Sequence, residues 1–273
     1  MKLDNPAARL LSILEEGLEY KDESNCREVW CEILSVKTGD NATLMGRIGK
    51  VMSLSTDIVE SLNNIGGVKV DRYLHWVKPI ENAFIQNNLN GQWKGFRGQI
   101  NSHVINYLSM TSDLLSHKCP EPILKENSLH SILKNSRKLI DEVRQSDLPE
   151  NIKEFMIKQL HKICLAVEEH SISGSDSVSS AVESAFGYGV LHAEAVEAAK
   201  TSPVAKKFWQ NMANIALVVS ISAGVQQLAP PIIKLLPDIN FSEEAASSQE
   251  VEGADSETLN KSSKKDAGTG ASS

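Results

Sequence analysis

Residues 208–233 read FWQNMANIALVVSISAGVQQLAPPII and contain no charged side chain, the longest such run in the chain. Lys206 and Lys207 precede this run, and Lys234 follows it. About 20 uncharged residues can span a bilayer, whereas the strictly apolar part, Ile215–Val225, has the length of a buried or interfacial segment, about 10–14 residues. The run therefore decides between a bundle that buries this helix in its core and a protein that inserts it into a membrane.

The segment before this run is expected to pack against it as a helical hairpin, Asp176–Leu236. Between Asp176 and Lys200 small residues recur every four positions, which lets two helix backbones approach closely. The short connection Thr201–Pro203 favours an antiparallel pair. The candidate residues for packing in this hairpin, or for contact with a membrane, are Ala181, Ala185, Gly189, Ala193, Trp209, Ala216, Val219, Ser220 and Gly224.

Apolar residues at helical spacing fill most of the preceding chain. Asn5 and Asn25 stand where helix N-caps are expected, and Asn5 is followed by a proline in the first turn. The tail after Phe241 is rich in serine, alanine, glycine and acids and is expected to be disordered. The sequence thus predicts an all-α fold: a multi-helix bundle with a C-terminal hydrophobic helical hairpin and a disordered acidic tail.

Changes in composition and spacing divide the chain into four expected parts. They are a small N-terminal helical subdomain at 1–67, with separate helices near 42–52 and 56–65; an amphipathic helical bundle at 68–171; the small-residue-rich hydrophobic hairpin at 172–240; and the disordered tail at 241–273. A polar break at Ser171–Ser175 marks the start of the hairpin. No segment repeats at a fixed length, which argues against a solenoid.

Charge and cysteine usage narrow the choice of partners and compartment. Seven acids and three lysines after residue 240 give the tail a charge of −4, so the first 240 residues carry only −3 of the total of −7. Without a large basic surface, nucleic acid is a poor partner. Four irregularly spaced cysteines and an N-terminus without an apolar stretch predict a cytoplasmic protein with reduced thiols. Association with a membrane through residues 208–233 stays open.

No catalytic, cofactor or metal motif stands out. His161, Cys164 and His170 share one helical segment, but a metal site would need further converging ligands. The sequence Gly46–Lys50 has glycines and a lysine without the spacing of a phosphate-binding loop. We therefore expect a non-enzymatic protein with no cofactor, no metal and no small-molecule substrate.

Trp76, Trp93 and Phe96 surround an asparagine-rich turn and are the candidates for binding a protein partner. The favoured alternative is that they close a hairpin of the core. The expected function is that of a helical effector or adaptor, which binds a protein partner through its N-terminal helices and engages a membrane or a second copy through the 176–236 hairpin. The alternative is a wholly soluble helical interaction or scaffolding protein with the hairpin as buried core.

Overall fold

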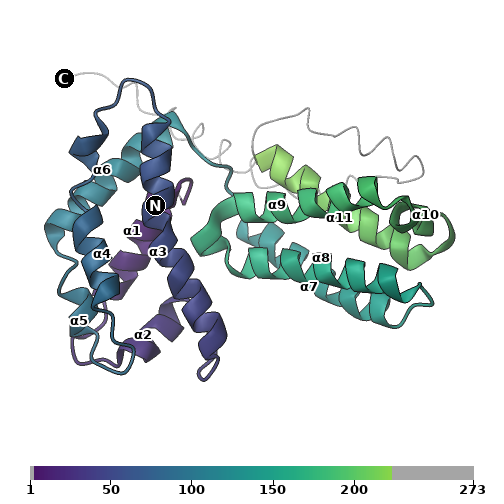
Figure 1. Ribbon diagram of the computed structural model, residues 1–273, viewed down its shortest axis with the longest axis horizontal. Helices are drawn as coiled ribbons and strands as arrows, with labels where there is room; N and C mark the ends of the chain where they lie inside the picture. Colours follow the sequence, from purple (N-terminus) through teal and green to yellow (C-terminus); the bar gives the residue numbers. More distant parts are fainter. Residues whose placement is uncertain (1–2, 223–273) are drawn as a thin grey trace, which may run out of the picture.

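The computed structural model describes residues 3–222, and this part of the chain is all-α, without a β-strand. Its helices form two lobes that lie beside each other (Figure 1). The N-lobe, residues 3–118, contains α1 (Pro6–Leu18), α2 (Cys26–Ile33), α3 (Asn41–Asn63), the 3-10 helix η1 (Val70–Tyr73), α4 (Val77–Ile85), α5 (Lys94–Arg97) and α6 (Ser102–Lys118). The C-lobe, residues 126–222, contains α7 (Glu126–Arg144), α8 (Glu150–Glu168), α9 (His170–Leu191), α10 (Ala193–Thr201) and α11 (Pro203–Ser222).

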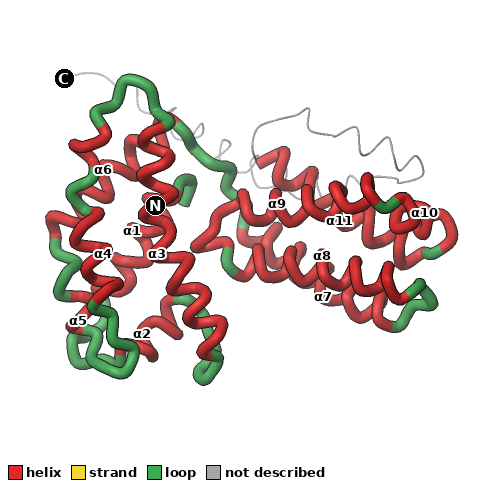
Figure 2. Tube along the Cα trace, in the orientation of Figure 1, coloured by secondary structure: helices red, strands yellow, loops and turns green. Residues whose placement is uncertain are grey.

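The all-α fold class is confirmed by these residues, and short loops join nearly all the helices (Figure 2). The predicted tail at 241–273, the end of the hairpin beyond Ser222 and the candidate Gly224 lie outside the described residues. The divisions at residues 67 and 171 stay predictions about folding units. Buried hydrophobic side chains gather in two clusters, one within residues 7–115 with Ile172 added and one within residues 124–215.

Two expected helix boundaries are wrong. The helices expected at 42–52 and 56–65 are one helix, α3, because Leu54 and Ile58 continue its buried face through the serine-rich stretch. Ser53 is accommodated in the helix by donating its hydroxyl to the Lys50 carbonyl oxygen at 2.8 Å. The helix expected to run from 176 to 200 is instead interrupted at His192, whose φ of −130° and ψ of 80° separate α9 from α10.

The N-terminal caps that the sequence indicates are present. The Asn5 side-chain oxygen accepts the Ala8 amide at 2.9 Å, and Asn25 accepts the amides of Arg27 and Glu28 at 3.0 and 3.2 Å. Each cap satisfies amides that have no acceptor within the first helical turn. The polar break expected at 171–175 is a kink inside α9, where Gly174 has a φ of 67°.

The core of the C-lobe is built around α11, which packs against α7, α9 and α10. Phe208, Trp209 and Met212 of α11 are fully or almost fully buried. The Phe155 ring of α8 lies edge-on to Phe208, with centroids 5.7 Å apart. The described part of the charge-free run is therefore enclosed by the other helices of its own lobe over its aromatic half.

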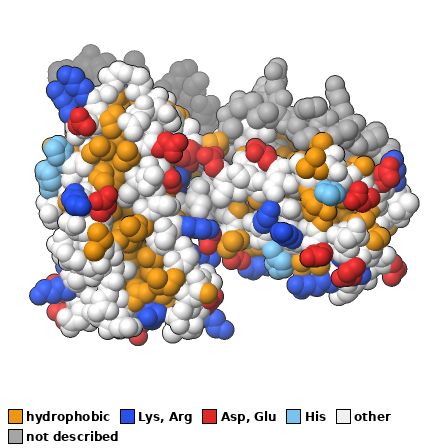
Figure 3. Space-filling view, viewed as in Figure 1, with side chains coloured by type: hydrophobic (Ala, Val, Ile, Leu, Met, Phe, Trp, Pro, Cys, Tyr) orange, Lys and Arg blue, Asp and Glu red, His pale blue; other side chains and the backbone are white. Residues whose placement is uncertain are grey.

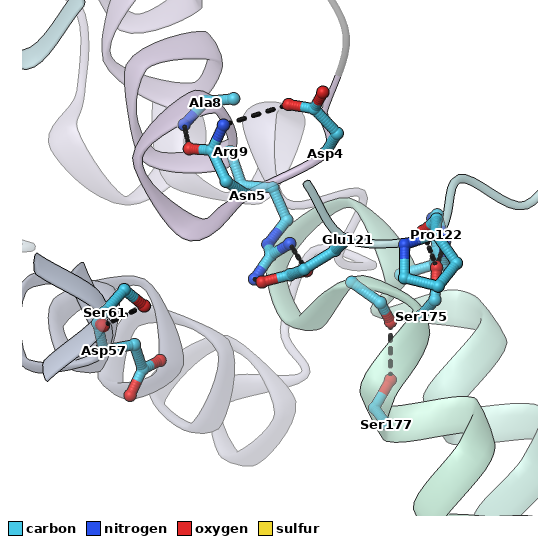
Figure 4. Close-up of polar contacts among 12 residues, drawn as sticks. Asp4, Asn5, Ala8, Arg9, Asp57, Ser61, Glu121, Pro122, Ser175 and Ser177 are labelled. Carbon is cyan, nitrogen blue, oxygen red and sulfur yellow. Dashed lines mark hydrogen bonds and ion pairs between the residues drawn. The ribbon is translucent and has the colours of Figure 1, made fainter. Parts of the chain in front are cut away.

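A buried arginine joins the two lobes. Arg9 of α1 donates its Nε–H to the Ile172 carbonyl oxygen at 3.0 Å and pairs both terminal nitrogens with the Glu121 carboxylate in the interlobe linker (Figure 4). The Ser175 hydroxyl donates to the Pro122 carbonyl oxygen beside this pair. A Cβ at Gly174 would lie 2.5 Å from the Arg9 guanidinium, and the positive φ there also favours glycine. The kink thus brings the backbone close enough for Arg9 to reach it.

Candidate functional site: the outer face of helix α3

The aromatic residues predicted to meet a partner lie in the core of the N-lobe. Trp76, Trp93 and Phe96 are 0%, 1% and 2% exposed. The Trp93 ring stacks on Phe96 at a centroid distance of 4.8 Å, and its Nε1–H donates to the Gly17 carbonyl oxygen at 2.7 Å. Their burial agrees with the alternative that these residues pack in the core. Their side chains are not exposed for contact with another protein.

The predicted small-residue stripe divides between interior and surface. Ala181, Ala185 and Gly189 of α9 are buried, whereas Ala193 is exposed at the start of α10. A Cβ at Gly189 would lie 2.7 Å from the Trp209 ring, so this glycine makes room for that indole.

The α11 candidates contact the interior of the C-lobe. Trp209 is 1% exposed and donates its Nε1–H to the Ala195 carbonyl oxygen at 3.0 Å. Ser220 is buried, and Ala216 and Val219 are half-buried against the C-lobe core. Within residues 3–222, none of the helices combines the length and the apolar character that a membrane span requires.

The residues considered for a metal do not converge. His161 is exposed, Cys164 is buried and His170 is half-buried at the start of α9. Burial and the nearby Arg9 cation lower the pKa of His170, which favours its neutral imidazole. In the part of the chain that the structure describes, no three histidine, cysteine or acidic side chains are placed to share a metal ion.

One surface of the N-lobe stands out, and it belongs to α3. The residues of its outward face carry no charge over four turns, and all are exposed: Ala42, Met45, Gly46, Gly49, Met52, Ser53 and Thr56. At 100° per residue these positions fall on one side of the helix, opposite Val51 and Ile58 in the core. We call this surface the α3 face. In the view of Figure 3, hydrophobic side chains show at several places on the surface of the N-lobe, the lobe to which α3 belongs.

Methionine and glycine give the α3 face its shape. Met45 and Met52 are 55% and 45% exposed, which is high for large apolar side chains. A Cβ at Gly46 or Gly49 would meet no atom within 4 Å, so neither glycine serves packing within the described structure. The result is a smooth strip of helix backbone flanked by two flexible, polarizable side chains.

Hydrogen bonds and ion pairs attach α3 to its neighbours on the side away from the α3 face. Arg47 donates to the carbonyl oxygens of Leu34 and Ser35 at 2.7 and 3.2 Å, and its Nε–H lies 3.3 Å from the Glu169 carboxylate. Lys50 pairs with the other oxygen of Glu169. Because Arg47 and Glu169 are each 5% exposed, the contacts of Arg47 are shielded from water, and they hold α3 against the start of α9. The α3 face thus belongs to a helix that is anchored on its other side.

The sequence contained a signal for this surface that composition alone did not bring out. Gly46 and Gly49 do not belong to a phosphate-binding loop, because they lie within a long helix that no strand precedes in the described residues. Five residues of the α3 face fall within the helix predicted at 42–52, and the single longer helix α3 adds Ser53 and Thr56 to the same side. Comparison with family models, with curated proteins and with solved structures finds no match for this chain.

Proposed function

We propose that this protein is a non-enzymatic helical adaptor that binds a protein partner through the α3 face. The observation that carries the proposal is the exposure of Met45 and Met52 beside two glycines that have no packing role inside the described structure. Exposed methionine is typical of surfaces that adapt to a partner, and glycine permits close approach of another backbone. The rigid attachment of α3 through Arg47 means that binding needs no reordering of the helix.

The size of the α3 face favours a single helix of the partner as the occupant. The strip from Ala42 to Thr56 is about 22 Å long at 1.5 Å per residue, and a helix is about 10 Å wide. Its footprint is thus about 220 Å², far below the roughly 800 Å² per partner of a stable complex. We therefore expect a transient interaction in which one apolar helix lies along α3, rather than a permanent dimer.

Site-specific crosslinking tests this function. A photo-reactive phenylalanine analogue is encoded at position 45 and, as a control, at position 110, because Met45 and Met110 are both 55% exposed and lie on different helices. We expect a discrete protein adduct from position 45 and none from position 110. That protein is then purified and titrated against the full chain.

The binding measurement decides the proposal. Met45→Glu with Met52→Glu should weaken binding at least tenfold, because charge enters an apolar contact, whereas Met110→Glu should leave it within twofold. Both variants should keep the helical circular dichroism of the parent, since all three side chains are exposed. Equal adducts from the two positions, or equal affinities of the two variants, would refute the role of the α3 face.

The sequence also predicts that the hairpin at residues 176–236 engages a membrane or a second copy. Burial of Phe208, Trp209 and Met212 supports the alternative in which the hairpin is core of a wholly soluble interaction protein. Val219→Arg separates the two. If the hairpin is core, the variant loses stability and the parent shows no binding to vesicles. If the hairpin acts on membranes, the parent sediments with vesicles and the variant, still folded, does not.

A further inference from the structure

The end of the C-lobe remote from the N-lobe carries an apolar groove. It holds about 640 Å³ and lies between the α7–α8 turn and the α10–α11 turn. Its apolar lining comes from Leu148 and Ile152 on one side and from Ala198 and Val204 on the other. Leu148 and Ile152 are themselves buried, so the floor belongs to the lobe core while the groove stays open above it.

The rim of the groove is acidic. Asp147, Glu194 and Glu197 line it and are exposed, and none of its lining residues is a lysine or an arginine. Glu194 lies 3.3 Å from the imidazole of His192, an ion pair only when that histidine is protonated. Acidic side chains also show near this end of the C-lobe in Figure 3. An apolar floor with a negative rim fits a segment that combines an apolar side chain with several cations.

The chain itself contains a segment of this chemistry. Beyond Lys234 the only basic residues are Lys261, Lys264 and Lys265, and they follow Leu259 in a stretch, 258–265, that has no acid. The acids after residue 240 lie on either side, at 243–257 and at Asp266. This segregation gives a local charge of +3 within a tail whose total is negative.

We propose that the basic segment 259–265 binds the groove at the free end of the C-lobe of its own molecule. The three lysines meet the rim carboxylates, and Leu259 contacts the apolar floor. The contact competes with any outside cationic partner, so the segment acts as an internal occupant of the groove. The groove and the α3 face lie on different lobes, so binding at one does not require the other.

The length of the chain permits this contact. The groove lies at the start of α11, and this helix of 20 residues carries the chain about 30 Å away to Ser222. From Ser222 to Lys261 there are 39 residues, which reach about 130 Å when extended at about 3.4 Å each. The segment can therefore return to the groove, and its attachment raises its local concentration there.

Zero-length crosslinking of the full chain tests the proposal. A carbodiimide joins lysine to carboxylate only where the two are in contact, and mass spectrometry identifies the joined pairs. The Lys207–Glu142 ion pair, at 2.8 Å, is the internal positive control. We expect the monomer to yield links from the tail lysines to Glu194, Glu197 or Asp147, and 0.5 M salt to reduce them severalfold because the charges are exposed.

Two variants complete the test. Replacing Lys261, Lys264 and Lys265 by glutamine should open the groove, so that a synthetic peptide of residues 256–267 binds this variant at least threefold more tightly than the parent. Glu194→Gln with Glu197→Gln should abolish that binding, and both changes lie on exposed side chains. Three results would overturn the proposal. The Lys207–Glu142 link could form while no link from the tail lysines does, or links from the tail lysines could appear only in dimers. The peptide could also bind the parent and the variant without the three lysines with equal affinity.

Discussion

Replacing Arg9 by methionine tests whether the polar contacts between the lobes contribute to stability. The Arg9 side chain is 5% exposed and its partner Glu121 is 21% exposed, so the pair is largely shielded from water. Methionine keeps the apolar stem of the side chain but removes the guanidinium group, its charge and the bond to the Ile172 carbonyl oxygen. The perturbation is therefore mainly electrostatic, with a smaller cost from the space that the guanidinium leaves.

The expected loss can be worked from these contacts. Removing one partner of a buried ion pair costs about 3–5 kcal/mol, because the remaining charge stays in an apolar setting. Glu121 retains some access to water, which lowers the penalty, so we expect the free energy of unfolding to fall by about 2–3 kcal/mol. Glu121→Gln should cost a similar amount, because it leaves the more deeply buried Arg9 cation without its anion, although the guanidinium keeps neutral acceptors.

Urea unfolding followed by tryptophan fluorescence and circular dichroism measures this effect. Trp30, Trp76 and Trp93 report on the N-lobe, and Trp209 reports on the C-lobe. The double variant with Glu121→Gln should cost less than the sum of the single changes, because the two residues share one interaction. A loss below about 0.5 kcal/mol for Arg9→Met, a value typical of surface substitutions, would show that the junction adds nothing to stability.

Three further predictions concern the C-lobe and the titratable groups. Gly189→Ala should lower the unfolding free energy by about 1–3 kcal/mol in urea titrations, because its Cβ would lie 2.7 Å from the Trp209 ring; unchanged stability would contradict this close contact. His170 has a lowered pKa in the folded state, so the unfolded chain binds its proton more readily, and stability should fall as pH drops below about 6.5. His170→Gln should flatten that part of the profile, and a parallel profile would exclude His170 as the cause. Of the four thiols, Cys119 alone is exposed, and burial raises the pKa of Cys26 to about 11, so a thiol reagent at pH 8 should label one cysteine rapidly in native protein and all four in urea; fast labelling of Cys26 would disprove its burial.

The fold class follows from local patterns in the sequence. Apolar spacing predicts helices, and Asn5 and Asn25 mark two of their starts because a cap depends only on the next three residues. Contacts between residues that are far apart in the sequence are not indicated by the residues around them. Trp93 bonds to Gly17 across 76 positions and Arg9 meets Glu121 across 112, and nothing near either residue indicates its partner.

The same limit explains the outcome for the charge-free run. Its length and composition suit both a bilayer and a protein core, and the difference depends on which other helices are available to cover it. Phe208 meets Phe155 of α8, and Trp209 enters the space left by Gly189 of α9. Gly189 is one of the small residues predicted to allow close packing. The spacing alone does not show that the Trp209 indole packs against it. The α3 face does not follow from spacing either, because the exposure of Met45 and Met52 depends on which helices pack against α3.

Ile172 belongs to the sequence of the second half but to the hydrophobic cluster of the first. An N-lobe separated from the C-lobe would lack three groups. They are the core side chain of Ile172, the carbonyl oxygen that accepts from Arg9, and the carboxylate of Glu169 that faces Arg47. The N-lobe would be left with two buried guanidinium groups short of acceptors, a costly state. Neither half is thus a transferable module, and protease nicking between residues 119 and 125 should leave two fragments that remain associated under native conditions.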